Sequence, residues 1–290
     1  MTVAYDTSSL ARFTGAVRGR VPLLIGAVAI GAPAAFAFDA GLQLGEDVMH
    51  LGGPLSLRSV RNRLSRLLYD RRFGVSTADF ADLSDFGLDH PERVYYSPAH
   101  WGTLRRALPR GHVGGGDVFV DLGAGKGRMA LEAASRYPFR RVIGVELSAE
   151  LTEVARANLA GTRLRLRAGG VEFVNSDVLD YVIPDDATVV FLNNPFRGEI
   201  FAATMDGLIA SADRRPRPIT VIYFNPVEEA YLLGTGRFRH VRTVTRRGGR
   251  PGDVYGTTRV YEVVPAVSDA GGRRPVEDGR PPASGDRDRP

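Results

Sequence analysis

From about residue 101, short apolar runs and longer amphipathic stretches alternate along the chain. Mostly apolar runs predict strands at residues 118–122, 142–147, 171–174, 188–192, 219–224, 238–245 and 258–264. Apolar positions at helical spacing predict helices at residues 101–108, 128–137, 149–159 and 200–211. Strands that alternate with helices favour an α/β fold with a doubly wound, mainly parallel sheet. The last two strands flank a Gly/Arg turn, so we expect a hairpin that adds one antiparallel strand.

A different pattern marks the N-terminal part of the chain. Residues 21–38 carry no charge, and their number reaches the lower limit for a membrane-spanning helix. Alanine and glycine dominate this run, however, and Pro22 and Pro33 interrupt it. A membrane-associated segment and a buried pair of hydrophobic helices both fit this composition.

Residues 56–72 have the pattern of an amphipathic helix. The apolar stripe consists of Leu57, Val60, Leu64, Leu67 and Leu68, opposite an arginine-rich face. Such a helix packs on the domain or lies on an anionic membrane surface. Residues 73–100 are mixed and loop-like. The tail, residues 266–290, has almost nothing to bury and is predicted to be disordered.

Composition limits the function classes further. The chain has 290 residues, 43% of them hydrophobic, which suffices for one good core with appendages. The formal net charge is +5, but the arginines form several patches that alternate with apolar residues. This spacing favours solvated faces over a nucleic-acid footprint. The lack of cysteine excludes disulfides, thiolate metal sites and cysteine nucleophiles, and we predict no metal site.

The segment VFVDLGAGKGR, residues 118–128, follows a predicted strand and opens a predicted helix, as nucleotide-binding glycine loops do. Asp121 stands just before the first glycine. In a dinucleotide site the pyrophosphate lies over the helix N-terminus, and a carboxylate about 4 Å away would repel it by several kcal/mol. S-adenosylmethionine (SAM) has no phosphate, and its α-ammonium and sulfonium are cationic. Asp121 therefore favours SAM over NAD, and Gly123, Gly125 and Gly127 allow the methionine portion to approach the backbone.

Two further acids follow predicted strands. Glu146 ends the next strand, at the distance where an acid holds a ribose diol, and Asp177 follows the third strand, where a carboxylate can accept from the adenine N6 amine. One acid alone would be explained as a cap of a helix or turn. Three acids at successive strand ends, together with the glycine loop, predict a SAM site at the carboxyl edge of the sheet.

The motifs VFVDLGAGKGRMALEAA and RRVIGVELSAEL resemble class I SAM-dependent methyltransferases, and a bacterial group with an FVDLGSGKGR…VIGVEFSPEL signature in particular. The resemblance covers about residues 68–265. It extends to DRRFGVST at 70–77, YYSP at 95–98, NNPF at 193–196 and YFNP at 223–226. It implies a Rossmann-like, seven-stranded sheet whose last strand is antiparallel. It also implies methyl transfer, but it names no acceptor.

FLNNPF is similar to the Asn-Asn-Phe segment of the non-SET histone lysine methyltransferases. There, residues before the glycine loop help to cover the cofactor, which makes Tyr96 and Ser97 candidates here. The complete predicted SAM site comprises Tyr96, Ser97, Asp121, Gly123, Ala124, Gly125, Gly127, Glu146, Ser176, Asp177 and Asn193.

NNPF follows the predicted strand beside the glycine loop and is similar to the Asn-Pro-Pro-Tyr/Phe turn of amino-group methyltransferases, without the second proline. In that turn the Asn side chain and a backbone carbonyl accept from the acceptor nitrogen, and the aromatic ring packs on it. By position, Asn193 or Asn194 would orient the acceptor and Phe196 would stack on it. The alternative is an ordinary tight turn with Pro195 at a strand exit. The missing proline disfavours a nucleobase acceptor.

The other polar candidates are less specific. Lys126 is read as a solvent-facing loop residue rather than a contact to the cofactor carboxylate. Glu199 and His100 are read as structural rather than as general bases, because a nitrogen nucleophile needs only desolvation and loss of a proton to water. Tyr223 and Asn225 are candidates for the wall of an acceptor pocket.

The sequence thus predicts a SAM-dependent methyltransferase that works by in-line displacement, on a nitrogen of a protein side chain or small molecule. The alternatives are a membrane-tethered SAM-binding module without turnover and a nucleic-acid methyltransferase. We expect an N-terminal extension (1–55), an amphipathic helix with a cofactor lid (56–100), the catalytic domain (101–265) and the tail. Because SAM is cytoplasmic, we predict a cytoplasmic enzyme, attached to the inner face of the plasma membrane if residues 21–72 bind a membrane surface. Cleaved export after Ala37 is disfavoured for the same reason.

Overall fold

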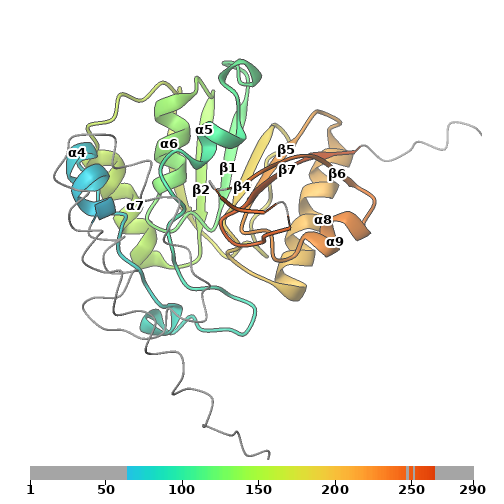
Figure 1. The fold of residues 1–290 in the computed structure, drawn as a ribbon, viewed down its shortest axis with the longest axis horizontal. Helices are drawn as coiled ribbons and strands as arrows, with labels where there is room; N and C mark the ends of the chain where they lie inside the picture. The colour runs from blue at the N-terminus through green and yellow to red at the C-terminus, as the bar shows by residue number, and fades with distance from the viewer. Residues whose placement is uncertain (1–63, 246–247, 251, 265–290) are drawn as a thin grey trace, which may run out of the picture.

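One seven-stranded sheet organises the chain in the computed structural model, which describes residues 64–245, 248–250 and 252–264 (Figure 1). The strands are β1 Val118–Leu122, β2 Arg141–Glu146, β3 Val171–Asn175, β4 Val189–Leu192, β5 Thr220–Phe224, β6 Phe238–Val244 and β7 Thr258–Val263. Their order is β3-β2-β1-β4-β5-β7-β6, and β7 runs antiparallel to both β5 and β6. The predicted fold class, a mainly parallel Rossmann-like sheet with an antiparallel last strand, is confirmed.

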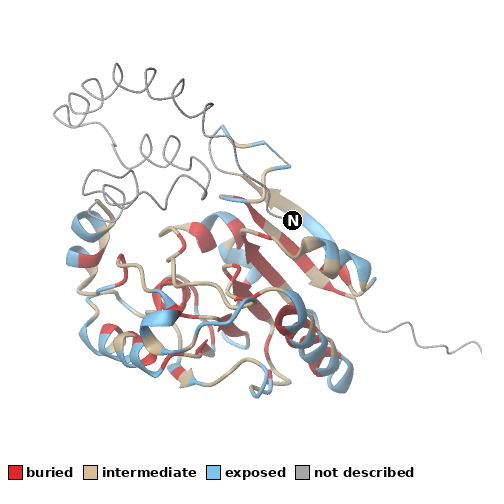
Figure 2. Cartoon of the chain, turned by 90° about the horizontal axis from the view of Figure 1, so that it is seen from below, coloured by how far each residue is buried: buried red, intermediate tan, exposed pale blue. Residues whose placement is uncertain are grey.

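Helices cover both faces of this sheet (Figures 1 and 2). The helices of the sheet region are α5 Thr103–Ala107, α6 Arg128–Arg136, α7 Ala149–Gly161, α8 Gly198–Arg214 and α9 Glu229–Gly234. Alternate residues of β1 serve the two faces, as the twofold period of a strand requires. Val118 and Val120 belong to the core that includes Phe201 of α8, whereas Phe119 belongs to the core that includes Ala130 of α6.

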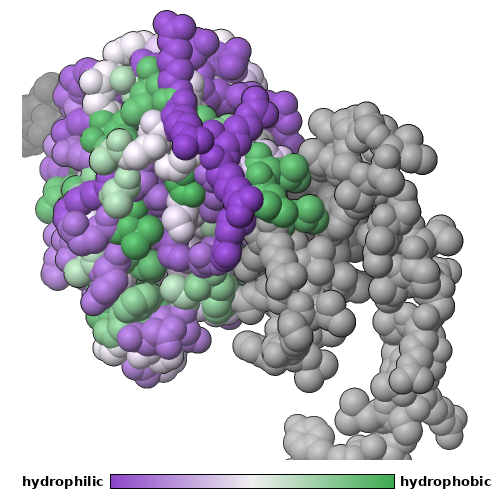
Figure 3. All heavy atoms as spheres, turned by 90° about the vertical axis from the view of Figure 1, so that its left-hand side faces the viewer, coloured by the Kyte–Doolittle hydropathy of each residue, from purple (hydrophilic) through white to green (hydrophobic). Residues whose placement is uncertain are grey.

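The described part of the predicted amphipathic helix consists of η4 Arg66–Asp70 and α4 Arg71–Phe73, and it ends at Gly74, which has a left-handed φ of 69°. Leu67 and Leu68 are 53% and 47% exposed. Figure 3 shows the side of the molecule on which α4 lies in Figure 1, where hydrophobic side chains are interspersed with hydrophilic ones. In this part, two members of the apolar stripe are therefore only about half covered.

The predictions for residues 1–55, including the charge-free run 21–38, and for the tail 266–290 lie outside the described residues. Within the described residues, no helix has the length and apolar character needed to cross a bilayer.

A buried ion pair ties the segment before the sheet to α6. Asp70 accepts hydrogen bonds from the backbone N–H of Thr77 (2.6 Å) and Ala78 (2.7 Å) and from Thr77 Oγ1 (2.9 Å). Arg128 Nη2 lies 3.7 Å from Asp70 Oδ1, while Arg128 Nε donates to Thr77 Oγ1 (2.9 Å) and Nη1 to the Ala99 carbonyl (3.1 Å). Both charged residues are almost fully buried. The DRRFGVST motif, residues 70–77, thus holds the segment that precedes the sheet against α6, the helix that follows the glycine loop.

Asp70→Ala should lower the free energy of unfolding by roughly 3–5 kcal/mol, because it leaves the buried Arg128 charge uncompensated. Urea unfolding followed by circular dichroism measures this loss. The matched control is Asp79→Ala, which removes an exposed partner of Arg66 and should cost less than about 1 kcal/mol. Equal losses in the two variants would show that the buried pair does not hold this segment.

Candidate functional site

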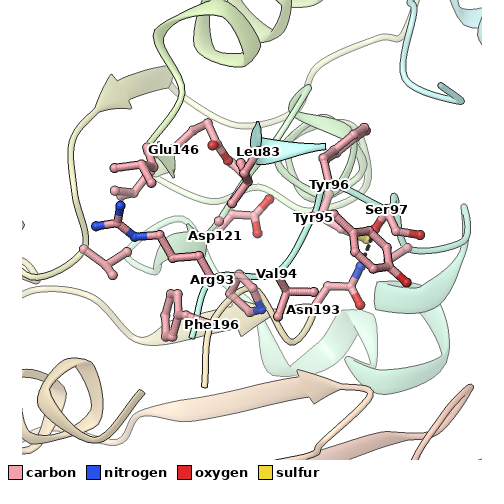
Figure 4. A pocket seen from close by; sticks show the side chains of 18 of the residues that line it. Leu83, Arg93, Val94, Tyr95, Tyr96, Ser97, Asp121, Glu146, Asn193 and Phe196 are labelled. Atoms are coloured by element: carbon pink, nitrogen blue, oxygen red, sulfur yellow. Dashed lines mark hydrogen bonds between the residues drawn. The ribbon is translucent and has the colours of Figure 1, made fainter. Parts of the chain in front are cut away.

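A cavity lies at the carboxyl ends of the central strands (Figure 4). Of the predicted residues, it is lined by Tyr96, Ser97, Asp121, Gly123, Ala124, Glu146, Asp177, Asn193, Pro195 and Phe196. Gly125, Gly127, Ser176 and Asn194 are not among the residues that line it. Its volume, traced by the centre of a water-sized sphere, is about 80 Å³.

Strand register brings the acids together. Asp121 in β1 pairs with Gly144 in β2, and Glu146 ends β2 opposite Asn175 of β3. Asp177 follows β3 by two residues. Parallel strands end at one edge of the sheet, so side chains distant in sequence converge there. Figure 4 shows Asp121 in the middle of the group, with Glu146 and Arg93 on one side and Ser97 and Asn193 on the other.

Asp121 and Glu146 are buried acidic groups. They are 2% and 7% exposed, and within the described residues neither forms an ion pair with a basic side chain. Glu146 accepts from the backbone N–H of Gly125 (2.7 Å) and Ser148 (3.0 Å). Burial, and then the charge of Glu146, raises the pKa of Asp121 to about 8. Burial also raises the pKa of Glu146, against the effect of these hydrogen bonds. This pair of carboxylates suits a cationic ligand.

The three loop glycines all have a left-handed φ, which favours glycine at each position: 76° at Gly123, 53° at Gly125 and 83° at Gly127. Each also receives a side chain from another segment. Ideal Cβ atoms there would lie 2.4 Å from Pro195 Cβ, 2.1 Å from Tyr96 Cε2 and 2.6 Å from Phe173 Cζ, respectively. The space beside each glycine, which the sequence analysis assigned to the methionine portion of the cofactor, is therefore filled by a side chain of the protein.

Tyr96 lies over the glycine loop. Its hydroxyl donates to the Thr77 carbonyl (2.9 Å), and the Lys126 ammonium lies 5.5 Å from the centre of its ring. Burial lowers the pKa of Lys126, but this residue does not line the cavity. Tyr96 thus covers the loop, and Lys126 packs on the outer part of that cover.

The segment before the glycine loop is joined to the NNPF turn by backbone hydrogen bonds. The Val94 N–H donates to the Pro195 carbonyl (3.0 Å), and the Arg197 N–H donates to the Glu92 carbonyl (2.7 Å). An isolated bridge links Arg93 and Phe196. The cover of the cavity and the predicted acceptor turn therefore form one unit.

Glu92 strengthens this unit. Its carboxylate accepts from the backbone N–H of Glu199 and Ile200, both at 3.1 Å, in the first turn of α8. These bonds hold the pKa of Glu92 below its ordinary value. The Glu199 side chain is exposed and does not line the cavity. It is therefore not positioned to act as a general base, in agreement with its interpretation as a structural residue.

Asn193 is oriented by a chain of amide hydrogen bonds. The Gly256 N–H donates to Asn225 Oδ1 (2.7 Å), so Asn225 presents Nδ2 to Asn193 Oδ1 (2.9 Å). Asn193 Nδ2 then donates to the Ser97 carbonyl (2.7 Å), shown as a dashed line in Figure 4. The backbone N–H at one end of the chain fixes the orientation of both amides. Asn225 uses one lone pair of Asn193 Oδ1, and among the described residues no second donor to this oxygen is found.

Asn194 points elsewhere. Its φ is 45°, it is 5% exposed, and its Oδ1 accepts from the Tyr223 hydroxyl (3.3 Å). Of the two asparagines that the sequence offered for orienting an acceptor, only Asn193 lies on the cavity wall. Tyr223, a candidate for that wall, supports Asn194 instead.

The cavity also contains residues that the sequence reasoning missed. Arg93, Leu83, Met129 and Arg128 line it, and Arg93 Nη2 pairs with Asp177 Oδ2. The available signal was the position of Arg93 two residues before the YYSP motif. His100 does not line the cavity, and its ring lies near Phe224.

Known proteins resemble part of this chain. Residues 119–214 match a family described as a methyltransferase domain. A protein-lysine N-methyltransferase of Saccharolobus islandicus is 30% identical over 105 residues, which cover 36% of this chain and 62% of that protein. A release factor glutamine methyltransferase of Mycolicibacterium smegmatis is 32% identical over 141 residues, which cover 49% and 45% of the two chains.

A ribosomal RNA large subunit methyltransferase G of Shewanella amazonensis is 40% identical over 91 residues, covering 31% of this chain and 22% of that protein. The chain therefore spans less than two thirds of the length of each of these three relatives. Among solved structures, an RNA methyltransferase from Salinibacter ruber in complex with S-adenosyl-L-homocysteine is similar over 58% of this chain and 94% of that one. The identity is 24% and the TM-score is 0.40.

Asp121→Asn should weaken the pH dependence of stability in the ligand-free protein. The folded carboxyl keeps its proton up to about pH 8, whereas the unfolded one loses it near pH 3.9. Between these values the folded state binds more protons, so stability falls as the pH rises. Urea unfolding at pH 5, 6.5 and 8 should give a shallower decline for Asp121→Asn, by about one proton. Parallel declines would contradict the buried, protonated carboxyl.

Proposed function

From the premise that residues 119–214 form a class I SAM-dependent methyltransferase domain, we propose that the chain methylates a nitrogen atom of a protein side chain or small molecule. The methyltransferase class and the cofactor predicted from the sequence are confirmed by this family match. The observation that supports the proposal most is the composition of one cavity, in which two unpaired buried carboxylates face the NNPF turn.

The residues present fit SAM. Asp121 and Glu146 provide negative charge for its ammonium and ribose ends, and their burial keeps that interaction from being screened by water. Glu146 occupies the Gly125 N–H of the loop, so this N–H does not offer itself to a phosphate. When bound, SAM supplies an electrophilic methyl group on a sulfonium. Aromatic side chains of Phe191 and Phe196, both buried on the cavity wall, exclude water from this place.

Orientation of the acceptor falls to Asn193. Its Oδ1 already accepts from Asn225, and its remaining lone pair can accept an N–H of the acceptor and so direct the nitrogen lone pair toward the methyl group. Positioning of this kind supplies several kcal/mol of the barrier. Glu199 and His100 do not line the cavity, so neither is placed to take the proton of the acceptor. The acceptor nitrogen is expected to lose this proton to water before it enters the cavity. Two of the similar proteins carry names that state a protein acceptor, lysine in one and a release factor glutamine in the other, and this supports a protein nitrogen here.

An RNA acceptor has weaker support. The ribosomal RNA methyltransferase is similar over only 31% of this chain. Many of the described arginines are also neutralised by acids. Ion pairs engage Arg140, Arg141, Arg156, Arg214, Arg237 and Arg239. Each of these carboxylates lowers the positive charge that the surface offers to a phosphate backbone.

Incubation of fractionated cell extract with methyl-labelled SAM and the full-length chain, followed by mass spectrometry of the labelled product, tests the proposal. We expect label on nitrogen, in a protein or small molecule, that survives ribonuclease. Label that is lost with ribonuclease would point to RNA, and label on oxygen would contradict the nitrogen assignment.

Two variants separate cofactor binding from acceptor orientation. Asp121→Ala should weaken S-adenosylhomocysteine binding roughly 10- to 100-fold in calorimetry, because it removes a charged partner. Asn193→Ala should retain that affinity within a few-fold but slow label transfer roughly 100-fold. The control is Asp206→Asn, an exposed position on α8 outside the cavity. Full transfer by Asn193→Ala would exclude this residue from the acceptor site.

A further inference from the structure

Arg93 occupies the part of the cavity that the sequence assigns to the adenine base. Its Nη2 forms an ion pair with Asp177 Oδ2, and the two side chains are 22% and 20% exposed. Asp177 Oδ1 accepts from the Leu179 N–H (3.1 Å). Both carboxylate oxygens of the residue expected to accept from the adenine amine are thus engaged within the protein.

The cavity has to enlarge before it can hold a nucleoside. Its volume of about 80 Å³ is well below the ~300–1,000 Å³ of clefts that bury small-molecule ligands. The neighbouring Tyr96 is held firmly by its hydrogen bond to Thr77 and by its contact with Gly125. Within the described residues, the Arg93 side chain is held by one partly exposed ion pair. The Arg93 side chain therefore moves out of the cavity more easily than the ring of Tyr96 does.

We propose that Arg93 is an affinity-determining residue of the cofactor site. In the cofactor-free chain it closes the base end by pairing with Asp177, and it releases Asp177 when the base enters. This inference rests on the proposed SAM site. It adds that the guanidinium of Arg93 competes with the adenine base for Asp177. The cost of breaking the ion pair is then part of the observed cofactor affinity.

The backbone around Arg93 is bonded to the acceptor turn. Arg93 bridges Phe196, and on either side of it Glu92 and Val94 bond to Arg197 and Pro195. These contacts place the backbone of Arg93 directly beside the turn that contains Asn193.

Calorimetric titration of the full-length chain with S-adenosylhomocysteine tests the inference. Arg93→Met should bind about three- to fivefold more tightly than the wild type, because the base no longer competes with a cation. Arg93→Lys, which keeps a cation, should stay near the wild-type value. The matched control is Arg239→Met, which removes an equally charged member of the exposed Arg239–Glu262 pair on the β6–β7 hairpin and should not change affinity.

A double-mutant cycle ties the effect to Asp177. In an Asp177→Asn background, Arg93→Met should change affinity less than about 1.5-fold, because the ion pair is already absent. Unchanged or weaker binding by Arg93→Met, or the same tightening in both backgrounds, would overturn the role of Arg93. Failure of the folded wild type to bind S-adenosylhomocysteine at all would instead overturn the proposed function, and this inference with it.

Discussion

Two acidic groups buried beside each other, with no basic ion-pair partner in the part of the chain that the structure describes, are the constraint on which the site depends. Burying one charge is costly, and burying two of like sign raises the cost further. The chain accepts this cost at Asp121 and Glu146, which lie at the carboxyl ends of the central strands β1 and β2. The raised pKa of Asp121 shows how the free protein limits the cost, since it holds a proton in place of a cation. A cationic ligand would replace that proton. The positive charge of SAM, the methyl donor, would then offset the cost of burying the two acids.

The rest of the site is built to bring distant segments onto this centre. The Asp70–Arg128 pair fixes the segment before β1 against α6. Backbone hydrogen bonds of Glu92 and Val94, later in the same segment, fix it against the NNPF turn. Tyr96 and Pro195 then enter the space that two loop glycines leave open. The segment that covers the cavity and the NNPF turn are thus parts of one hydrogen-bonded unit. Arg93 lies in this unit, and the role proposed for it rests on its ion pair with Asp177.

The sequence predicted the strands well because buried parallel strands are short apolar runs whose limits are set by glycines and charges. It also predicted the convergence of Asp121, Glu146 and Asp177, because the carboxyl ends of parallel strands share one edge. It could not choose between Asn193 and Asn194. That choice depends on the left-handed backbone at Asn194 and on the amide of Asn225, which lies in a different loop. The pairing of Arg93 with Asp177 was equally hidden, since only tertiary contacts bring the two residues together. The short helix α9 was missed because six residues carry too little periodicity.

Proton release on cofactor binding tests the central claim most directly. Titration of the wild type with SAM at pH 7, in buffers of different ionisation enthalpy, measures how many protons leave on binding. The account predicts net release in the wild type, because a cation next to Asp121 lowers a pKa that starts at about 8, and a much smaller release in Asp121→Asn. Binding of SAM without any difference in proton release between the two proteins would contradict it, as would tight binding of NAD in the same cavity.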